Sequence, residues 1–183
     1  MDNELKKQIA KSFLNDSGDF LKRYEVLKAN QTHIGNRSKL LIDIIFSFEC
    51  SLKALIYLES PISLEETYKK TIKHNLKELI GMIDTSAITE IAETISRNSK
   101  CFSVDNRYAL EANKNFRKNG ALGELYYSTI ANPVWLENIY EKACDLHVYV
   151  NSKTEKLKIK SLNDIDIDKE LDNSKRISQL KKR

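Results

Sequence analysis

The three histidines are the residues of this chain best suited to proton transfer, because an imidazole gains or loses a proton near neutral pH. His74 lies close to a predicted helix start, where it either braces that helix or acts as a catalytic group. His147 lies on the apolar face of another predicted helix, which favours a hydrogen-bonded core histidine. His33 lies in a polar loop. His74 is therefore the one histidine that we carry forward as a catalytic candidate.

Glu49 is an acid within an almost wholly apolar segment, and Lys53 follows it one helical turn later. Residues four apart meet on one face of a helix, which favours an ion pair. The alternative is a polar contact from Glu49 to a neighbouring helix or to a ligand. The chain has no metal-binding helix motif, glycine-rich phosphate loop or nucleophile motif. We therefore expect no metal and no cofactor.

The segment from Asn36 to Ile80 resembles the central signature of HEPN domains, small all-helical domains of prokaryotic toxin–antitoxin and antiviral systems. Those domains combine a buried helix ending in Glu-x-x-Leu-Lys-Ala-Leu with a following His-x-Leu-x-x-Leu helix. The matching pieces here begin at Glu49 and at His74. The resemblance implies a helical bundle that forms a homodimer. It also implies one of two roles, an RNA-cutting enzyme or an inactive binding and dimerisation module.

Active HEPN ribonucleases carry an arginine followed, after four to six residues, by a histidine, and two copies of this pair face one cleft of the dimer. The histidine exchanges a proton with the ribose 2′-hydroxyl or the leaving group, and the arginine stabilises the phosphorane. No histidine of this chain follows an arginine at that spacing. The nearest match begins at Arg97-Asn98 and has Phe102 in the histidine position. Because phenylalanine cannot move a proton, the sequence favours a module that is not an enzyme.

Arg107-Tyr108 resembles an Arg-Tyr pair that follows the His-x-Leu-x-x-Leu helix in several HEPN subgroups. Such a pair could bind phosphate and stack on a base. Alternatively, Arg107 pairs with Glu111 on the same helix, and Tyr108 is half-buried. The catalytic candidates are thus Arg97, Asn98, Arg107 and His74, and the candidates for RNA or phosphate binding are Arg97, Arg107 and Tyr108.

Composition favours one helical domain. The 183 residues are 41% apolar and 31% charged, and they include only five glycines and two prolines, which favours long helices. No apolar run is long enough to span a membrane, and the N-terminus lacks a secretory signal. Cys50, Cys101 and Cys144 are too scattered for a disulfide framework. We expect a cytoplasmic protein.

Apolar spacing predicts an up-and-down bundle of four to five main helices, which is an all-α fold. The helices are expected at about 4–29, with a possible break at Asp16-Ser17-Gly18, and at 37–58, 73–83, 105–117 and 133–150, with a further helix restarting at Thr85-Ser86. Ser63 and Glu66 resemble a helix cap. The 37–58 helix is apolar almost all round, which suggests that it pairs with a second copy.

Residues 1–150 are therefore expected to form the bundle, and residues 151–183 a charged extension. That extension carries the whole net charge of +4. Within it, 156–160 and 164–168 alternate strictly between charged and apolar residues, which favours a β-hairpin. A terminal helix running to Leu180, or disorder, are the alternatives.

These observations favour a HEPN-like, cytoplasmic, dimeric binding module that is not catalytic, in a bacterial defence or toxin–antitoxin setting, with an RNA or protein partner. One alternative is a divergent, metal-independent ribonuclease toxin in which Arg97, Arg107 and His74 gather in the dimer cleft. Another is a regulatory subunit that partners a small nucleotidyltransferase.

Overall fold

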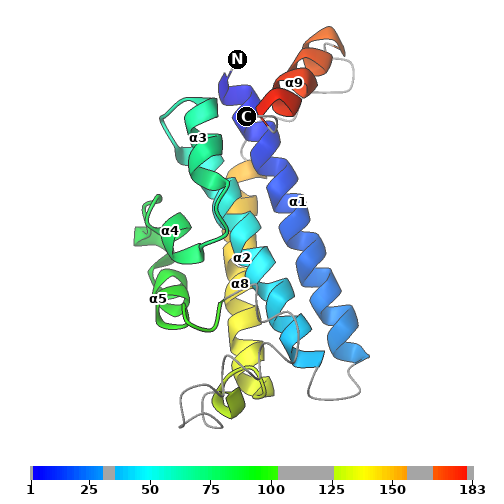
Figure 1. Ribbon diagram of the computed structural model, residues 1–183, viewed down its shortest axis with the longest axis vertical. Coiled ribbons are helices and arrows are strands. Elements are labelled where there is room, and N and C mark those ends of the chain that lie inside the picture. Colours follow the sequence, from blue (N-terminus) through cyan, green and yellow to red (C-terminus); the bar gives the residue numbers. More distant parts are fainter. Residues whose placement is uncertain (1, 31–35, 103–125, 156–166, 181–183) are drawn as a thin grey trace.

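Three long helices form the body of the described part of the chain (Figure 1). The computed structural model describes residues 2–30, 36–102, 126–155 and 167–180. Within these ranges all regular structure is helical, so the predicted all-α fold is confirmed. The long helices are α1 (Asp2–Ala29), α2 (Arg37–Glu59) and α8 (Pro133–Glu155). The shorter α3 (Leu64–Thr71), α4 (Leu76–Ile80), η2 (Ser86–Ile88) and α5 (Thr89–Arg97) follow one another along one side of α2.

The first helix, α1, continues through Asp16-Ser17-Gly18, so the predicted break there is wrong. A glycine inside a helix costs only about 1 kcal/mol relative to alanine. Ser17 is fully buried and its hydroxyl bonds to two serines of α2. These contacts hold the helix straight where the local sequence favours a break.

The central helix, α2, begins where the sequence predicted and is buried along nearly its whole length. Helices α1, α3, α4 and α8 all contact it. Its largest fully buried side chains include Leu41, Ile44, Ile45, Phe48, Leu52 and Leu55. The apolar surface that suggested pairing with a second copy is thus covered within one chain.

The ends of α2 and α3 are fixed by polar side chains. The Lys6 amine, which is buried, donates to the carbonyl oxygens of Ser60 (2.9 Å) and Ile62, just beyond the last turn of α2. A cation at this end of a helix complements the helix dipole. Ser63 Oγ accepts a hydrogen bond from the Glu66 N–H (3.2 Å), so the predicted cap of α3 is confirmed.

The predicted 73–83 helix is shorter in the structure, where α4 begins only at Leu76. Asn75 is its cap, because the Asn75 side-chain oxygen accepts from the N–H groups of Lys77 and Glu78. His74 therefore precedes the helix and takes no part in capping it. The next predicted helix divides into η2 and α5, whose apolar residues Ile88, Ile91, Ala92 and Ile95 are buried.

Helix α8 begins at Pro133, as predicted, and runs on to Glu155, five residues past the expected end of the bundle. Residues 167–180 form α9 (Ile167–Leu180). The terminal helix is therefore confirmed for this part of the tail, and the hairpin is wrong for residues 167 and 168. The remaining residues of that hairpin, 156–166, lie outside the described residues.

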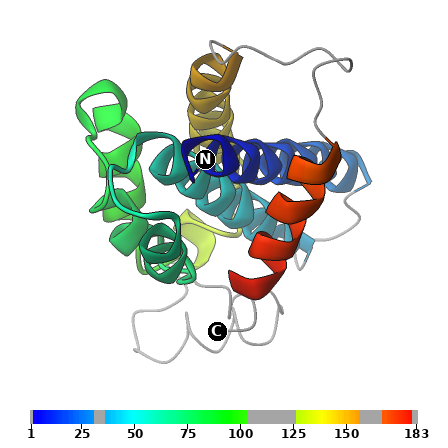
Figure 2. The same cartoon turned by 90° about the horizontal axis from the view of Figure 1, so that it is seen from above.

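Helix α9 lies across the end of the bundle, beside the N-terminal ends of α1 and α3 (Figures 1 and 2). Asn173 and Leu180 are buried on its inner side, and Ile177 packs against the core. In the described part of the chain, no helix is both long and apolar enough to cross a membrane.

Candidate functional site

A buried ion pair on α2 forms the centre of the candidate site. The Lys53 amine donates to Glu49 Oε1 at 2.7 Å, and the two side chains are only 7% and 6% exposed. Lys53 Nζ also lies 5.7 Å from the centre of the Phe13 ring. The interpretation of Glu49 and Lys53 as an ion pair is thus confirmed, but the pair lies inside the protein and not on a solvated helix face.

His74 brings an exposed imidazole to this buried pair. Its Nδ1 lies 2.9 Å from Glu49 Oε1, while its side chain is 67% exposed. Because a carboxylate only accepts hydrogen bonds, Nδ1 must carry the hydrogen, and Nε2 is left as the other ring nitrogen. A histidine fixed in this way by an acid is suited to hold a ligand or to exchange a proton through Nε2.

One oxygen of Glu49 is not used by these contacts. Glu49 Oε1 accepts from both Lys53 and His74, whereas Oε2 is buried without a hydrogen-bond partner in the described part of the chain. A buried, unpaired carboxylate oxygen is costly. The arrangement therefore holds His74 in position at the expense of some stability.

Arg97 and Asn98 lie at the end of α5 and interact locally. Arg97 Nη2 is 3.7 Å from Glu93 Oε2, one turn earlier, and both side chains are largely exposed. Asn98 donates to the Thr94 carbonyl oxygen at 2.8 Å. Among the described residues, no interaction joins Arg97 to His74. The structure thus leaves these two catalytic candidates with separate partners.

Phe102, which follows Arg97 after four residues, is a packing residue. Its ring centre lies 6.0 Å from that of Phe48 and 6.5 Å from that of Trp135, in tilted arrangements. Its side chain is partly buried against the core. The position therefore contributes to an aromatic cluster that joins the end of α5 to α2 and α8.

Arg107, Tyr108 and Glu111 lie outside the described residues, as does His33. The proposed phosphate-binding pair and its alternative ion pair therefore remain predictions. In the ranges that the structure describes, no three His, Cys, Asp or Glu side chains gather in a way that could hold a metal ion.

A second histidine site lies where α1, α2 and α8 meet; the sequence predicted a hydrogen-bonded core histidine at His147 but not its serine partners. His147 Nδ1 lies 3.2 Å from Ser17 Oγ, which in turn contacts Ser47 Oγ (2.9 Å) and Ser51 Oγ (2.8 Å). All three serines are fully buried. A β-carbon added at Gly18 would lie 3.2 Å from the imidazole, so glycine makes room for the ring.

Burial and the nearby Lys22 charge lower the pKa of His147, in that order of importance. The predicted core role of this histidine agrees with its hydrogen bond to Ser17. Ser47 and Ser51 lie four residues apart on an otherwise apolar helix, and that spacing is the signal that could have revealed the network.

A second buried acid of α2, Asp43, was also missed. It is 1% exposed, and Arg23 of α1 donates to its Oδ1 through Nε (2.8 Å) and Nη2. This hydrogen bond raises the pKa of Arg23. Arg23 also lies over the Phe20 ring. An acid in an apolar helix was the available signal, as it was for Glu49.

No protein-family model, curated protein or solved structure matches the chain.

Proposed function

We propose that this chain is a HEPN-like, dimeric binding module that acts in the cytoplasm and does not cut RNA. Its setting would be bacterial defence or a toxin–antitoxin pair, and its partner a protein or an RNA. The resemblance of the Glu49 and His74 segments to the HEPN signature suggests this role. The all-α bundle of the described residues is compatible with it.

The observation that carries the non-catalytic part of the proposal is the packing of Phe102. Active HEPN ribonucleases need a histidine here, next to the RNA. The Phe102 ring instead lies in a cluster with Phe48 and Trp135. An aromatic side chain in such a cluster stabilises the fold, and it cannot take up a proton. The nearest match to the ribonuclease motif thus lacks its general acid–base group.

An RNA-cleavage assay on the purified protein, together with light scattering, tests the proposal. We expect no cleavage of generic single-stranded RNA above a buffer control. We also expect a mass about twice the monomer mass of 21.1 kDa. Arg97→Ala and His74→Ala serve as matched variants. Wild-type cleavage that disappears in either variant would overturn the non-catalytic proposal, and a monomer at every concentration would overturn the dimer.

The Glu49–His74 contact favours one alternative, a divergent ribonuclease in which His74 is the proton-transfer group. Glu49 orients the imidazole, and the ring is exposed to solvent. In that case His74→Ala would abolish RNA cleavage, and Glu49→Gln would weaken it by changing the orientation of the ring. Phe102→Leu, which alters only packing, is the matched control and would leave cleavage measurable.

A further inference from the structure

The turn between α3 and α4 carries uncompensated positive charge around an exposed apolar side chain. Residues 69–77 contain four lysines and no acid. Two of the lysines have partners, since Lys70 pairs with Glu66 (3.5 Å) and Lys73 with Glu78 (2.7 Å). Lys69 and Lys77 are exposed and have no acidic partner among the described residues, and Ile72 between them is 60% exposed. We refer to Lys69, Ile72 and Lys77 as the basic corner.

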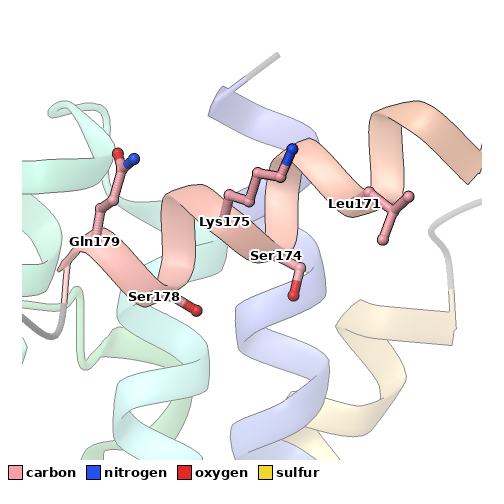
Figure 3. Close-up of a pocket in the computed structure, with 5 residues that line it drawn as sticks. All are labelled: Leu171, Ser174, Lys175, Ser178 and Gln179. Atoms are coloured by element: carbon pink, nitrogen blue, oxygen red, sulfur yellow. The ribbon is translucent and has the colours of Figure 1, made fainter.

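The outer side of α9 has the opposite character at its N-terminal half. Leu171 is 56% exposed, and Asp168 and Asp172, which flank it on the helix, are both exposed. In the described part of the chain neither aspartate has a cationic partner. Leu171 also begins an open depression that continues along the helix past Ser174, Lys175, Ser178 and Gln179 (Figure 3). We refer to Asp168, Leu171 and Asp172 as the acidic face.

The two surfaces cannot meet within one chain. The acidic face is held outward because Asn173 and Leu180, on the other side of α9, are buried against the bundle. The α3–α4 turn and α9 lie on opposite sides of the N-terminal end of α1 (Figures 1 and 2). A contact between the basic corner and the acidic face therefore requires a second molecule.

We infer that two copies of the chain pair through reciprocal contacts between the basic corner of one copy and the acidic face of the other. In this pairing Ile72 packs against Leu171, and the two lysines lie opposite the two aspartates. A two-fold axis makes each contact occur twice, which doubles the buried interface area and the number of opposite-charge contacts. The inference rests on the dimer of the proposed function and names its contact surface, since α2 is already covered within one chain.

A second copy fits the basic corner better than a nucleic acid does. The basic corner has lysines but no arginine, and arginine is the side chain that binds phosphate best because it can donate two parallel hydrogen bonds. Glu66 and Glu78 flank it, and a phosphodiester strand, with a charge at every nucleotide, would lie against them as well as against the lysines. Two separate carboxylates need to face only Lys69 and Lys77. The chain itself supplies that partner, with an exposed leucine between two aspartates.

Charge reversal on each surface tests the pairing by sedimentation equilibrium at low salt. We expect Lys69→Glu/Lys77→Glu and Asp168→Lys/Asp172→Lys each to raise the dimer dissociation constant by at least about tenfold, because like charges then face each other. Combining all four substitutions in one chain restores opposite charges and should restore the dimer. An equimolar mixture of the two double variants should also form dimers.

The matched control is Lys11→Glu/Lys39→Glu, which makes the same change of charge on α1 and at the start of α2. Both of these lysines are exposed, and the dimer should persist. Far-UV circular dichroism of every variant checks that the helices remain folded.

A wild-type dimer that neither reversal weakens would overturn the inferred contact and leave the proposed dimeric function standing. Weakened variants that fail to recover when the opposite charges are combined would overturn the contact as well. A wild-type monomer across the whole concentration range would overturn both the contact and the dimer. If Lys69→Glu/Lys77→Glu abolished binding of labelled single-stranded RNA without affecting the dimer, the corner would be a nucleic-acid site and the inference would fail.

Discussion

The two histidine sites of this molecule form hydrogen bonds through the same ring atom, but they differ in how exposed the ring is and in whether its partner is charged. His74 and His147 both hydrogen-bond through Nδ1, His74 to the Glu49 carboxylate and His147 to the Ser17 hydroxyl. The first imidazole is mostly exposed, and the acid that holds it is buried. The second is half-buried among neutral hydroxyls where α1, α2 and α8 meet.

The difference shows how a structural histidine can be told from a candidate functional one. At the His147 site the ring fills space and completes a network of neutral hydroxyl groups, so removing the ring should mainly lower the stability of the fold. At the His74 site the buried charges of Glu49 and Lys53 compensate each other, and the exposed ring adds little to packing. A buried ion pair is weak evidence for stability, so His74, which this pair holds at the surface, stays the candidate functional histidine.

The largest effect is expected from removing the lysine of the buried pair. Lys53→Met leaves the Glu49 carboxylate buried with His74 as its one hydrogen-bond partner among the described residues, and breaking such a pair costs about 3–5 kcal/mol. Urea unfolding followed by circular dichroism measures this loss. Glu49→Gln/Lys53→Met, which removes both charges at nearly constant volume, should be close to wild type. A double variant as unstable as the single one would show that packing, and not charge, dominates at this site.

A smaller loss is expected at the interior histidine. His147→Ala removes the hydrogen bond to Ser17 and the ring that lies against Gly18. We expect a decrease of about 1–3 kcal/mol in the free energy of unfolding. His147→Asn, which keeps a polar group near the position of Nδ1, should recover part of it. An unchanged stability in the alanine variant would contradict the structural role of His147.

The pH dependence of stability gives a separate test of the His147 site. Because the folded state holds the pKa of His147 below its ordinary value, the unfolded chain takes up this proton first as the pH falls. The contribution of His147 is therefore fully present above pH 7 and is lost as the pH falls below about 6.5 towards the folded-state pKa. Melting temperatures between pH 7.5 and 5 should fall more in wild type than in His147→Ala. Equal slopes in the two proteins would refute this.

The smallest effect on stability is expected at His74. His74→Ala leaves the Glu49–Lys53 pair intact and removes a ring that is mostly exposed. The cost should be about 1 kcal/mol or less, the net value of a single hydrogen bond, because Lys53 still donates to Glu49 Oε1. Urea unfolding of His74→Ala beside His147→Ala gives the direct comparison. If His74→Ala lowered the free energy of unfolding as much as His147→Ala does, His74 would have a structural role in stabilising α4. That result would weaken the case for His74 as a functional residue.

Much of the fold could be predicted because its signals lie three or four residues apart. The apolar spacing of α2, the Ser63 cap, the Pro133 start of α8 and the Glu49–Lys53 pair are all local patterns. Local patterns misled where a distant contact overrides them. Gly18 suggested a break in α1, yet Ser17 is held by α2 and Gly18 lies against His147 of α8.

The candidate site could be predicted only in part for the same reason. Glu49 and His74 were both identified, but 25 residues separate them, and their contact depends on how α4 packs against α2. Asp43 and Arg23 are 20 residues apart, and His147 and Ser17 are 130 apart. No spacing in the sequence predicts such pairs. The alternating residues 167 and 168 likewise suited either a strand or the start of a helix, and in the structure they begin α9.

The sequence by itself determined that the described part of the chain is helical, that α2 is apolar almost all round and that a phenylalanine, Phe102, follows Arg97 after four residues. These properties depend on residue type and on the spacing of residues close together in the sequence, so they do not require knowledge of contacts with distant parts of the chain. Only the tertiary structure decided that Phe102 packs with Phe48 and Trp135, that α2 is covered within one chain and that Glu49 holds His74 at the surface. Those properties depend on which distant helices meet, because burial and long-range hydrogen bonds arise only when the helices pack.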